Sequence, residues 1–491
     1  MKMRFKKIIQ IALAGFFMLS AYNCEMDQEP EYVIDADNYF NSEDDYYKAL
    51  VGAYDLLQST YQNVLMGEIA SDNTLSGGES ANDVVGFQQV DEMTHGPVND
   101  QIKKVWDWMF AGVQRCNFIM ENKDKTEFEG KNQIIAETRF LRAYYHFELV
   151  KWFGGIPLKG DEMFVIGDEK TIPRSSVEEV YASIEADLIY ASENLAPVAP
   201  QLGRVTQGAA YALLGKVYLF QEKYQQAASA LDQVIGSGQY SLVQDYATLF
   251  EFEQENGPES IFEVQYVDNE GAGFECLQCS EGNVAVGFNG IRNYSGDLFT
   301  SGYSFNVPTE AVYNAFDEED LRRDIAILNI EAWANETGAT YGIGYKHTGY
   351  FNRKYLPRVR SDQSAGDMNL TNPNNYRAIR YADVLLMAAE AYNRGGLSDA
   401  TARNYLNQVR ERAFGNTNHN VTTSGSALTE AIWRERRLEL VGEAHRFFDL
   451  VRTGQAAANI DGFVAGKHEL FPIPFEEIQY SNGNWQQNPN Y

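Results

Sequence analysis

A dense group of ionisable side chains lies between residues 433 and 452. Acidic, basic and imidazole groups alternate there: Glu435, Arg436, Arg437, Glu439, Glu443, His445, Arg446 and Asp449. Paired carboxylates beside a histidine could carry out general acid–base chemistry. However, Glu435 and Glu439 are like-charge neighbours one helical turn apart, as are Glu439 and Glu443, and arginines are interleaved with them. The pattern favours an ion-pair network that fixes helix packing over a catalytic centre, which would also need a cleft and perturbed pKa values.

Four cysteines offer a second kind of chemistry. Cys276 and Cys279 form a C-x-x-C motif, but no second pair and no nearby histidine completes a zinc site. A local disulfide or two free thiols in a loop is therefore favoured over a metal or redox role. Cys116 lies in a helical pattern, where we expect a small buried apolar residue. No metal ligand set is predicted.

Sequence signatures of common enzyme classes are missing. The chain has no G-x-S-x-G, H-E-x-x-H, P-loop or dinucleotide-binding motif, and only six histidines. A glycosidase needs only two carboxylates placed about 5–10 Å apart. Because the chain has 69 acidic residues, composition alone leaves a glycoside hydrolase open as an alternative.

The charge balance limits the choice of ligand. The formal net charge of −29 repels nucleic-acid backbones and disfavours electrostatic docking on anionic membranes. Neutral ligands such as glycans remain open. Hydrophobic residues make up 44% of the chain and aromatic residues 13%, which predicts a large packed interior rather than disorder.

The N-terminus has the pattern of a targeting segment. Basic residues at positions 2–7 precede an apolar stretch over 8–19 that is too short to span a bilayer. The arrangement resembles a bacterial lipoprotein signal over residues 1–23, with Cys24 as the lipidated first residue. Because Tyr22 and Asn23 are not small, ordinary signal cleavage is the alternative. An acidic tether is predicted over 24–45. Its acidic stretch directly after Cys24 (Glu25, Asp27, Glu29 and Glu31) resembles the surface-export signal of Bacteroidetes lipoproteins, and a solvated tether that is simply acidic is the alternative.

Most of the remaining chain has helical periodicity. Apolar residues at helical spacing predict helices over 46–57, 105–118, 134–152, 379–392, 400–413 and 428–452. Within 208–235, six positions match the offsets of a tetratricopeptide repeat: Tyr211, Leu214, Gly215, Tyr218, Ala227 and Leu231. In that repeat, small residues let two antiparallel helices approach closely.

The region from about 266 to 373 differs from the rest of the chain. It is rich in Gly, Asn, Tyr and Phe, and long helical patterns are few. Loops held by a rigid scaffold often carry binding residues. We therefore predict an N-terminal helical scaffold over 46–265, a loop-rich insertion over 266–373 that carries the ligand face, and C-terminal helices over 374–491.

Three C-terminal segments carry a family resemblance. They read RYADVLLMAAEAY at 380–392, WRERRLELVGEAHRFFDLVRTG at 433–454 and LFPIPFEEIQYSNGNWQQNPNY at 470–491. Together with FNVPTEAVYNAF at 305–316 and the repeat-like segment, they resemble the SusD/RagB family of nutrient-binding outer-membrane lipoproteins. The resemblance implies an all-α fold, a tetratricopeptide-like scaffold of helical pairs with an irregular loop-rich insertion.

The resemblance also implies a function. We expect a lipid-anchored binding protein on the outer-membrane surface, without catalysis or cofactor, that delivers an oligosaccharide or polysaccharide to a SusC-like, TonB-dependent transporter. Some branches of the family bind peptides, so a peptide-binding, RagB-like lipoprotein is an alternative. A surface glycoside hydrolase and a protein-interaction scaffold are less favoured, because the lipoprotein-like N-terminus and the C-terminal segments indicate nutrient capture.

Two stretches could hold such a ligand. Sugar rings pack their C–H faces on aromatic rings, and their hydroxyls need polar partners. In the insertion, the candidates are Tyr294, Tyr303, Trp333 and Tyr341, and Trp333 is preferred because it is an aromatic residue in a polar setting. Tyr303 could instead pack under the segment at 305–309. The polar loop after the first helix offers Asp72 and Asn73, and family members commonly use that loop beside the ligand.

Overall fold

The computed structural model describes residues 39–270, 273–360 and 365–491. Helices dominate these residues, and the strands among them form small two-stranded sheets. The predicted all-α class is therefore confirmed. Cys24, the predicted signal peptide and most of the acidic tether lie outside the described residues. No helix in the described part is both long and apolar enough to cross a membrane.

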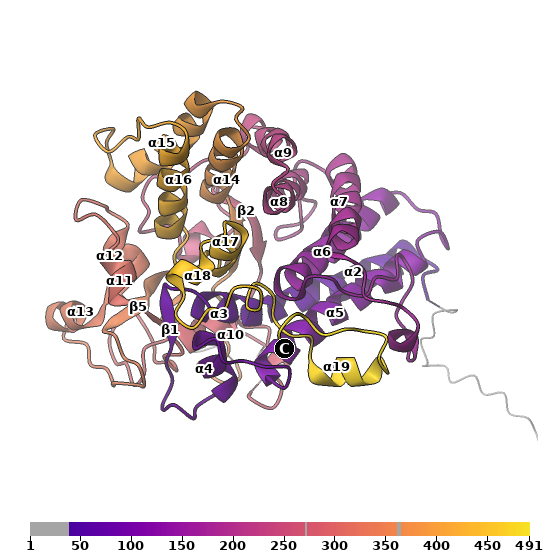
Figure 1. Cartoon of the computed structure of the whole chain (residues 1–491), viewed down its shortest axis with the longest axis horizontal. Helices are drawn as coiled ribbons and strands as arrows, with labels where there is room; N and C mark the ends of the chain where they lie inside the picture. Colours follow the sequence, from indigo (N-terminus) through magenta and orange to yellow (C-terminus); the bar gives the residue numbers. More distant parts are fainter. Residues whose placement is uncertain (1–38, 271–272, 361–364) are drawn as a thin grey trace, which may run out of the picture.

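The N-terminal region is a stack of helices, drawn in indigo to magenta in Figure 1. The long helix α6 is buried along nearly its whole length and packs on both α5 and α7. Ser176 begins α7 with a capping box, in which its hydroxyl and the Glu179 carboxylate each accept a backbone N–H. The helices are α2 (Glu43–Asp55), α3 (Tyr61–Ile69), α4 (Val85–Asp91), α5 (Asp100–Glu121), α6 (Lys131–Phe153), α7 (Val177–Asn194), α8 (Gln207–Phe220) and α9 (Tyr224–Gly236).

Helices α8 and α9 form the helical pair predicted at 208–235. A Cβ atom on Gly215 would lie 2.6 Å from the side chain of Leu231, so only glycine allows the observed approach of the two helices. Ala227 and Leu231 are fully buried at this contact. The small residue that the repeat requires, Gly215, thus allows α8 and α9 to pack closely.

The C-terminal helices close the scaffold, and one prediction about them is wrong. They are α14 (Tyr381–Arg394), α15 (Asp399–Phe414), α16 (Ser426–Glu439), α17 (Arg446–Arg452), α18 (Ala456–Asn459) and α19 (Phe475–Tyr480). The single helix predicted over 428–452 is interrupted between α16 and α17. Gly442 and Ala444 have positive φ angles of 82° and 66° there. A Cβ on Gly442 would meet the Asn352 side chain at about 2.5 Å, so the insertion packs directly onto this break.

The strands connect segments that are distant in the sequence. They are β1 (Thr74–Ser76), β2 (Ser260–Val264), β3 (Asn306–Pro308), β4 (Ile327–Asn329), β5 (Tyr350–Asn352) and β6 (Tyr376–Arg380). All pair antiparallel, as β1–β3, β2–β6 and β4–β5. Because β2 precedes residue 266 and β6 follows residue 373, the intervening chain leaves and rejoins the scaffold at one sheet. That arrangement is expected of an insertion, whose boundaries remain a prediction.

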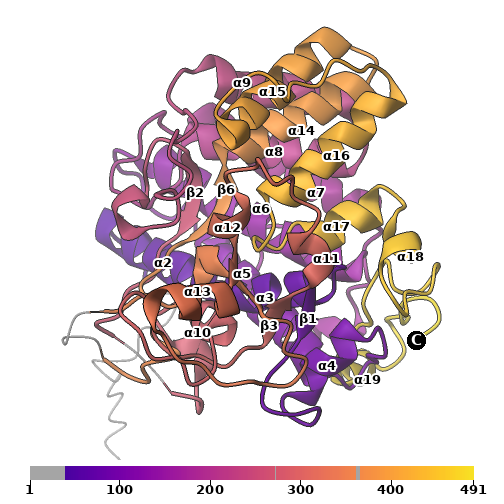
Figure 2. The same ribbon diagram turned by 90° about the vertical axis from the view of Figure 1, so that its left-hand side faces the viewer.

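The insertion has short helices and a small core of its own. Its helices are α10 (Val284–Asn289), α11 (Glu310–Tyr313), α12 (Arg323–Ala326) and α13 (Ile330–Thr337). A separate hydrophobic cluster forms around Tyr294, Phe299 and Phe351, and Trp333 and Tyr341 pack against its edge. Figure 2 shows α10 and α13 on the same side of the molecule as β1 and β3.

Candidate ligand-binding face

Trp333 lies half-buried on α13, at the edge of the insertion's small core. Its indole N–H donates a hydrogen bond to the Tyr294 hydroxyl, over 2.9 Å. The guanidinium of Arg353 lies 5.3 Å from the indole centroid, within cation–π range. Tyr294 itself is only 7% exposed. Tyr294 therefore orients the indole ring, while Trp333 presents the larger surface to solvent.

Tyr341 lies close to this pair. Ser295 and Thr340 exchange backbone hydrogen bonds of 2.9 and 3.0 Å, which fastens the loop before Tyr341 to the loop after Tyr294. The Tyr341 ring is half-buried and stacks beside the His347 ring, with centroids 5.9 Å apart. The structure thus brings together three of the six predicted residues: Tyr294, Trp333 and Tyr341.

A loop from the N-terminal scaffold completes the same surface. Gly78 accepts a backbone hydrogen bond from Tyr345 over 2.9 Å and donates one to Ser304 over 2.8 Å. A Cβ on the preceding Gly77 would lie 2.1 Å from the Ser304 carbonyl oxygen, so only glycine fits there. The loop at 77–84 and the insertion are therefore held together by backbone contacts.

Several aromatic residues on this surface were not predicted from the sequence. Tyr345 and His347 are half-buried, and Tyr350 stacks on Tyr313 with centroids 4.5 Å apart. The sequence did contain a pattern that could have identified them, because residues 341–351 contain four tyrosines or phenylalanines and a histidine. We call the group formed by Tyr294, Trp333, Tyr341 and His347 the aromatic face.

Tyr303 is placed beside this group rather than in it. Its ring packs between Phe274 and Phe288, with centroid distances of 5.7 and 5.8 Å. Its carbonyl accepts a hydrogen bond from the Arg292 side chain, over 3.0 Å. Part of the ring remains exposed, so contact with a ligand stays a prediction for Tyr303.

Asp72 and Asn73 are tied to the C-terminal helices. Arg446 forms a two-point contact with the Asp72 carboxylate, at 2.7 and 3.0 Å, and Arg437 lies 2.9 Å from the same group. Arg437 also donates to the Asn73 amide oxygen over 2.8 Å. Asn73 is fully buried, so in this structure it positions β1 and offers a ligand no surface. A role for Asp72 beside the ligand stays a prediction.

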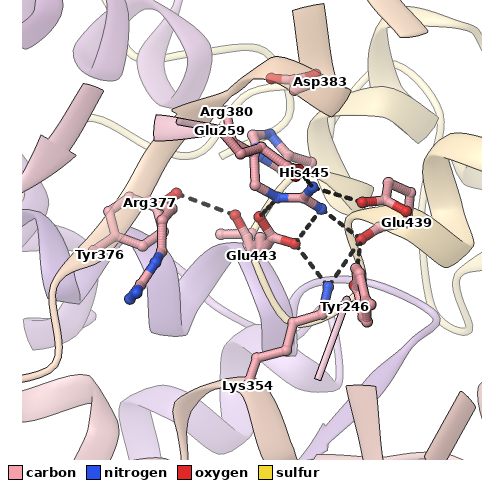
Figure 3. A network of polar contacts seen from close by, with 12 residues as sticks. Tyr246, Glu259, Lys354, Tyr376, Arg377, Arg380, Asp383, Glu439, Glu443 and His445 are labelled. Carbon is pink, nitrogen blue, oxygen red and sulfur yellow. Dashed lines mark hydrogen bonds and ion pairs between the residues drawn. The ribbon is translucent and has the colours of Figure 1, made fainter. Parts of the chain in front are cut away.

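The charged residues of 433–452 form the predicted ion-pair network, and Figure 3 shows the part of it around Glu439 and Glu443. Their partners, however, come mainly from other segments rather than from neighbouring arginines. Arg380, Arg412 and Arg322 lie 2.5, 2.6 and 2.7 Å from the Glu439 carboxylate. Lys354 and Arg380 both pair with Glu443 at 2.7 Å. Arg322 and Lys354 belong to the insertion, so the network fastens the insertion to the scaffold.

The electrostatics of this network argue against catalysis by it. Burial opposes the charged form of Glu439, but Arg412, Arg380 and Arg322 outweigh it and hold the pKa of Glu439 below its usual value. Burial likewise opposes the charged form of Glu443, while Arg380 and Lys354 keep its pKa low. Both side chains are fully buried. These carboxylates are saturated by cations and sealed from any substrate.

The cysteines and the possible metal ligands are the remaining reactive groups. Cys276 and Cys279 form a disulfide, and Cys116 is a buried free thiol. Within the described residues, no three His, Cys, Asp or Glu side chains cluster in a way that could hold a metal ion.

The sequence matches two family models. Residues 236–468 match the model described as "SusD family", and residues 25–219 match one described as "Starch-binding associating with outer membrane". SusD-like protein P2 of Formosa agariphila is 26% identical over 518 residues, which cover 96% of this chain and 98% of that protein.

Solved structures give the same picture. A laminarin-binding SusD-like protein is 35% identical, with a TM-score of 0.84 over 92% of this chain and 100% of that one. Surface glycan-binding protein A from Bacteroides thetaiotaomicron, solved with laminarihexaose, is 26% identical, with a TM-score of 0.80 over 91% of this chain and 100% of that one. The likeness therefore extends over nearly the whole described chain.

Proposed function

The chain belongs to the SusD family, and on that premise we propose that it binds a neutral glycan at the outer surface of the cell. The observation that carries this proposal is the orientation of Trp333 by Tyr294. It leaves the indole ring partly exposed, with Tyr341 packed against the same small core. Sugar rings stack their C–H faces on such rings. The excess of acidic residues over the whole chain favours an uncharged ligand over an anionic one.

The names of the relatives suggest which glycan to try first. One similar structure is described as laminarin-binding and another contains laminarihexaose. One matching family model is described as starch-binding. We therefore choose laminarihexaose as the first probe and maltohexaose as the second.

The protein acts, in this proposal, as a binder without catalysis. Relatives are named as binding proteins, and the buried carboxylates of the ion-pair network are inaccessible to a substrate. The family description also supports association with the outer membrane. A lipid at Cys24 as the anchor, and delivery to a SusC-like, TonB-dependent transporter, belong to the same proposal.

Calorimetry with the purified protein tests the binding step. We expect laminarihexaose or another neutral hexasaccharide to bind, and Trp333→Ala to weaken that binding at least tenfold. Tyr480→Ala is the matched control, because Tyr480 is an exposed aromatic residue on α19, away from the insertion. Unchanged affinity in a folded Trp333→Ala protein would show that the aromatic face is not the binding site.

Two further measurements test the remaining parts of the proposal. Incubation of the parent protein with the bound hexasaccharide should leave it intact by chromatography, whereas shortened products would reveal a hydrolase. Purification from native outer membranes in mild detergent should recover a TonB-dependent barrel with the protein. Consistent recovery of the protein alone would contradict the delivery step.

A further inference from the structure

A groove lies between α2, the segment at 197–206 and strand β2. One part is a cavity of about 410 Å³ whose lining includes Tyr47, Gln58 and Gln265, and the adjoining part is a cavity of about 640 Å³ whose lining includes Tyr240 and Asn256. The two parts share residues 201–204 and Glu263. Each volume falls in the range of about 300–1,000 Å³ that is typical of small-molecule sites.

Side-chain amides form part of the polar lining of this groove. Asn256 and Gln265 exchange two hydrogen bonds of 2.9 and 3.0 Å, which fixes both amide planes. Gln58 is held by the Glu281 carboxylate, over 2.9 Å. A carboxamide donates through nitrogen and accepts through oxygen, as a sugar hydroxyl also does. Such a lining matches a ligand that carries many hydroxyl groups.

Two tyrosine rings supply the apolar surfaces. Tyr47 is half-buried, and its hydroxyl donates to the Gln201 amide oxygen over 2.9 Å. This contact orients the exposed Gln201 side chain and leaves its two N–H groups without a partner within the described residues. Tyr240 lines the second part of the groove, and the neighbouring Leu202 is 82% exposed. The groove therefore combines two tyrosine rings with the free donors of Gln201, and the Arg204 guanidinium lies 5.6 Å from the Tyr47 ring centroid.

The charges around the groove disfavour an anionic ligand. Among the described residues that line it, the basic one is Arg204, which is engaged by the Glu137 carboxylate at 2.5 and 2.8 Å. The acidic lining residues are Asp55, Glu263, Glu270 and Glu281. Phosphate, sulfate or uronate groups would be repelled by this lining.

Glu263 adds a buried acceptor at the point where the two parts meet. It is only 3% exposed, and its Oε2 atom accepts from the Asn256 backbone and the Asn375 side chain, both over 3.1 Å. Its Oε1 atom accepts no hydrogen bond within the described residues, and the nearest Arg377 nitrogen lies 3.7 Å away. Glu263 therefore fixes Asn256 beside the groove from below and is itself covered.

From these features we propose that the groove is a second binding site for a neutral oligosaccharide, separate from the aromatic face. In Figure 1, α2 lies on the right of the molecule and α13 on the far left, so one short ligand cannot occupy both sites. The ligand class rests on the proposed function, while the location rests on the groove itself. Two sites on one chain would let the protein hold a polymer at two points, which raises its effective affinity.

Calorimetric stoichiometry separates the two sites. The probes are laminarihexaose and maltohexaose, each titrated into the parent, Trp333→Ala, Tyr47→Ala and Gln201→Ala proteins, with Tyr480→Ala as the control. Gln201 is exposed, so its truncation should leave the fold intact even if Tyr47→Ala does not. Melting temperatures verify that each variant is folded.

We expect two hexasaccharides per parent chain. Tyr47→Ala and Gln201→Ala should each weaken one binding event at least tenfold and leave the other, and Trp333→Ala should do the reverse. One hexasaccharide per chain, lost in Trp333→Ala and retained in both groove variants, would overturn the second site while sustaining the proposed function. If binding is lost only in the Tyr47→Ala and Gln201→Ala proteins, the groove is a binding site and the aromatic face is not. No binding of either probe would overturn the neutral-glucan assignment for both.

Discussion

The ammonium group of Lys354 lies 2.7 Å from the carboxylate of Glu443, and neither side chain is exposed to solvent. Lys354 comes from the insertion, and Glu443 from the break between α16 and α17. The ammonium also donates to the Glu439 carbonyl over 2.9 Å. One buried contact thus joins the loops that carry the aromatic face to the C-terminal helices.

Removal of Lys354 should destabilise the protein strongly. Lys354→Met leaves Glu443 and Glu439 with one cation fewer in a buried site, and loss of one partner of a buried pair costs about 3 kcal/mol or more. Denaturant unfolding measures the change. Lys48→Met is the matched control, because Lys48 pairs with Asp44 at the surface, with 63% and 66% of the side chains exposed. That variant should leave the free energy of unfolding nearly unchanged, and an equal effect in both would contradict the prediction.

Glu68 should make the stability depend on pH near neutrality. It is fully buried, one oxygen accepts the Ala444 N–H over 2.6 Å, and the other has no partner within the described residues. Burial raises the pKa of Glu68 from 4.5 to about 7. Between these values the folded state binds more protons than the unfolded state, so the contribution of Glu68 to stability falls as the pH rises from about 4.5 to 7.

Glu68→Gln removes this titration and keeps an acceptor for Ala444. The variant should be more stable than the parent at pH 8, by on the order of 2–3 kcal/mol, and the difference should shrink towards pH 4.5. Urea unfolding at several pH values measures it, with the exposed Glu193→Gln as the control. A constant difference across this pH range would show that Glu68 does not titrate there.

Tyr294→Phe tests how far orientation of Trp333 matters. The substitution keeps the ring in the small core but removes the acceptor of the indole N–H. The indole is then free in the unbound protein, and ordering it on binding costs about 1 kcal/mol, so we expect roughly fivefold weaker binding of the hexasaccharide. Calorimetry measures this, and Tyr480→Phe should have no effect. Parent-like affinity in Tyr294→Phe would mean that the indole is held by packing alone.

Cys24→Ala should prevent lipid attachment at the N-terminus. The charged segment before the apolar stretch and the acidic residues after Cys24 motivate this prediction. We expect the variant to leave the membrane fraction or to remain unprocessed, as judged by fractionation and mass spectrometry. A mature-sized variant that still sediments with membranes would exclude Cys24 as the anchor point.

The sequence predicted the repeating parts of the structure best. Gly215 and Leu231 mark the close approach of α8 and α9 because that contact is local and periodic. The break at Gly442 was missed because apolar residues continue in helical register across it, and only the packing of Asn352 reveals why the chain turns there. The partners of Glu439 were missed for a related reason: Arg322 and Arg380 are far away in sequence, and no periodicity identifies them.

Residue chemistry selected the candidate site from the sequence, and contact of these residues with a ligand stays a prediction. The structure brings Tyr294 and Tyr341 beside Trp333. Asn73 was selected for its chemistry, but burial against Arg437 takes its side chain from the surface. Sequence gives residue types, whereas exposure depends on which distant segment covers them.

The contacts that hold the insertion to the scaffold bear on how related proteins come to bind different sugars. Arg322 and Lys354 anchor it to Glu439 and Glu443, and β2–β6 closes its base, so these anchoring contacts lie outside the loops at 290–304 and 338–350. Mutations can accumulate in those loops while both anchors persist. Transplanting the loops between two relatives that retain the anchors should therefore transfer sugar preference from one to the other.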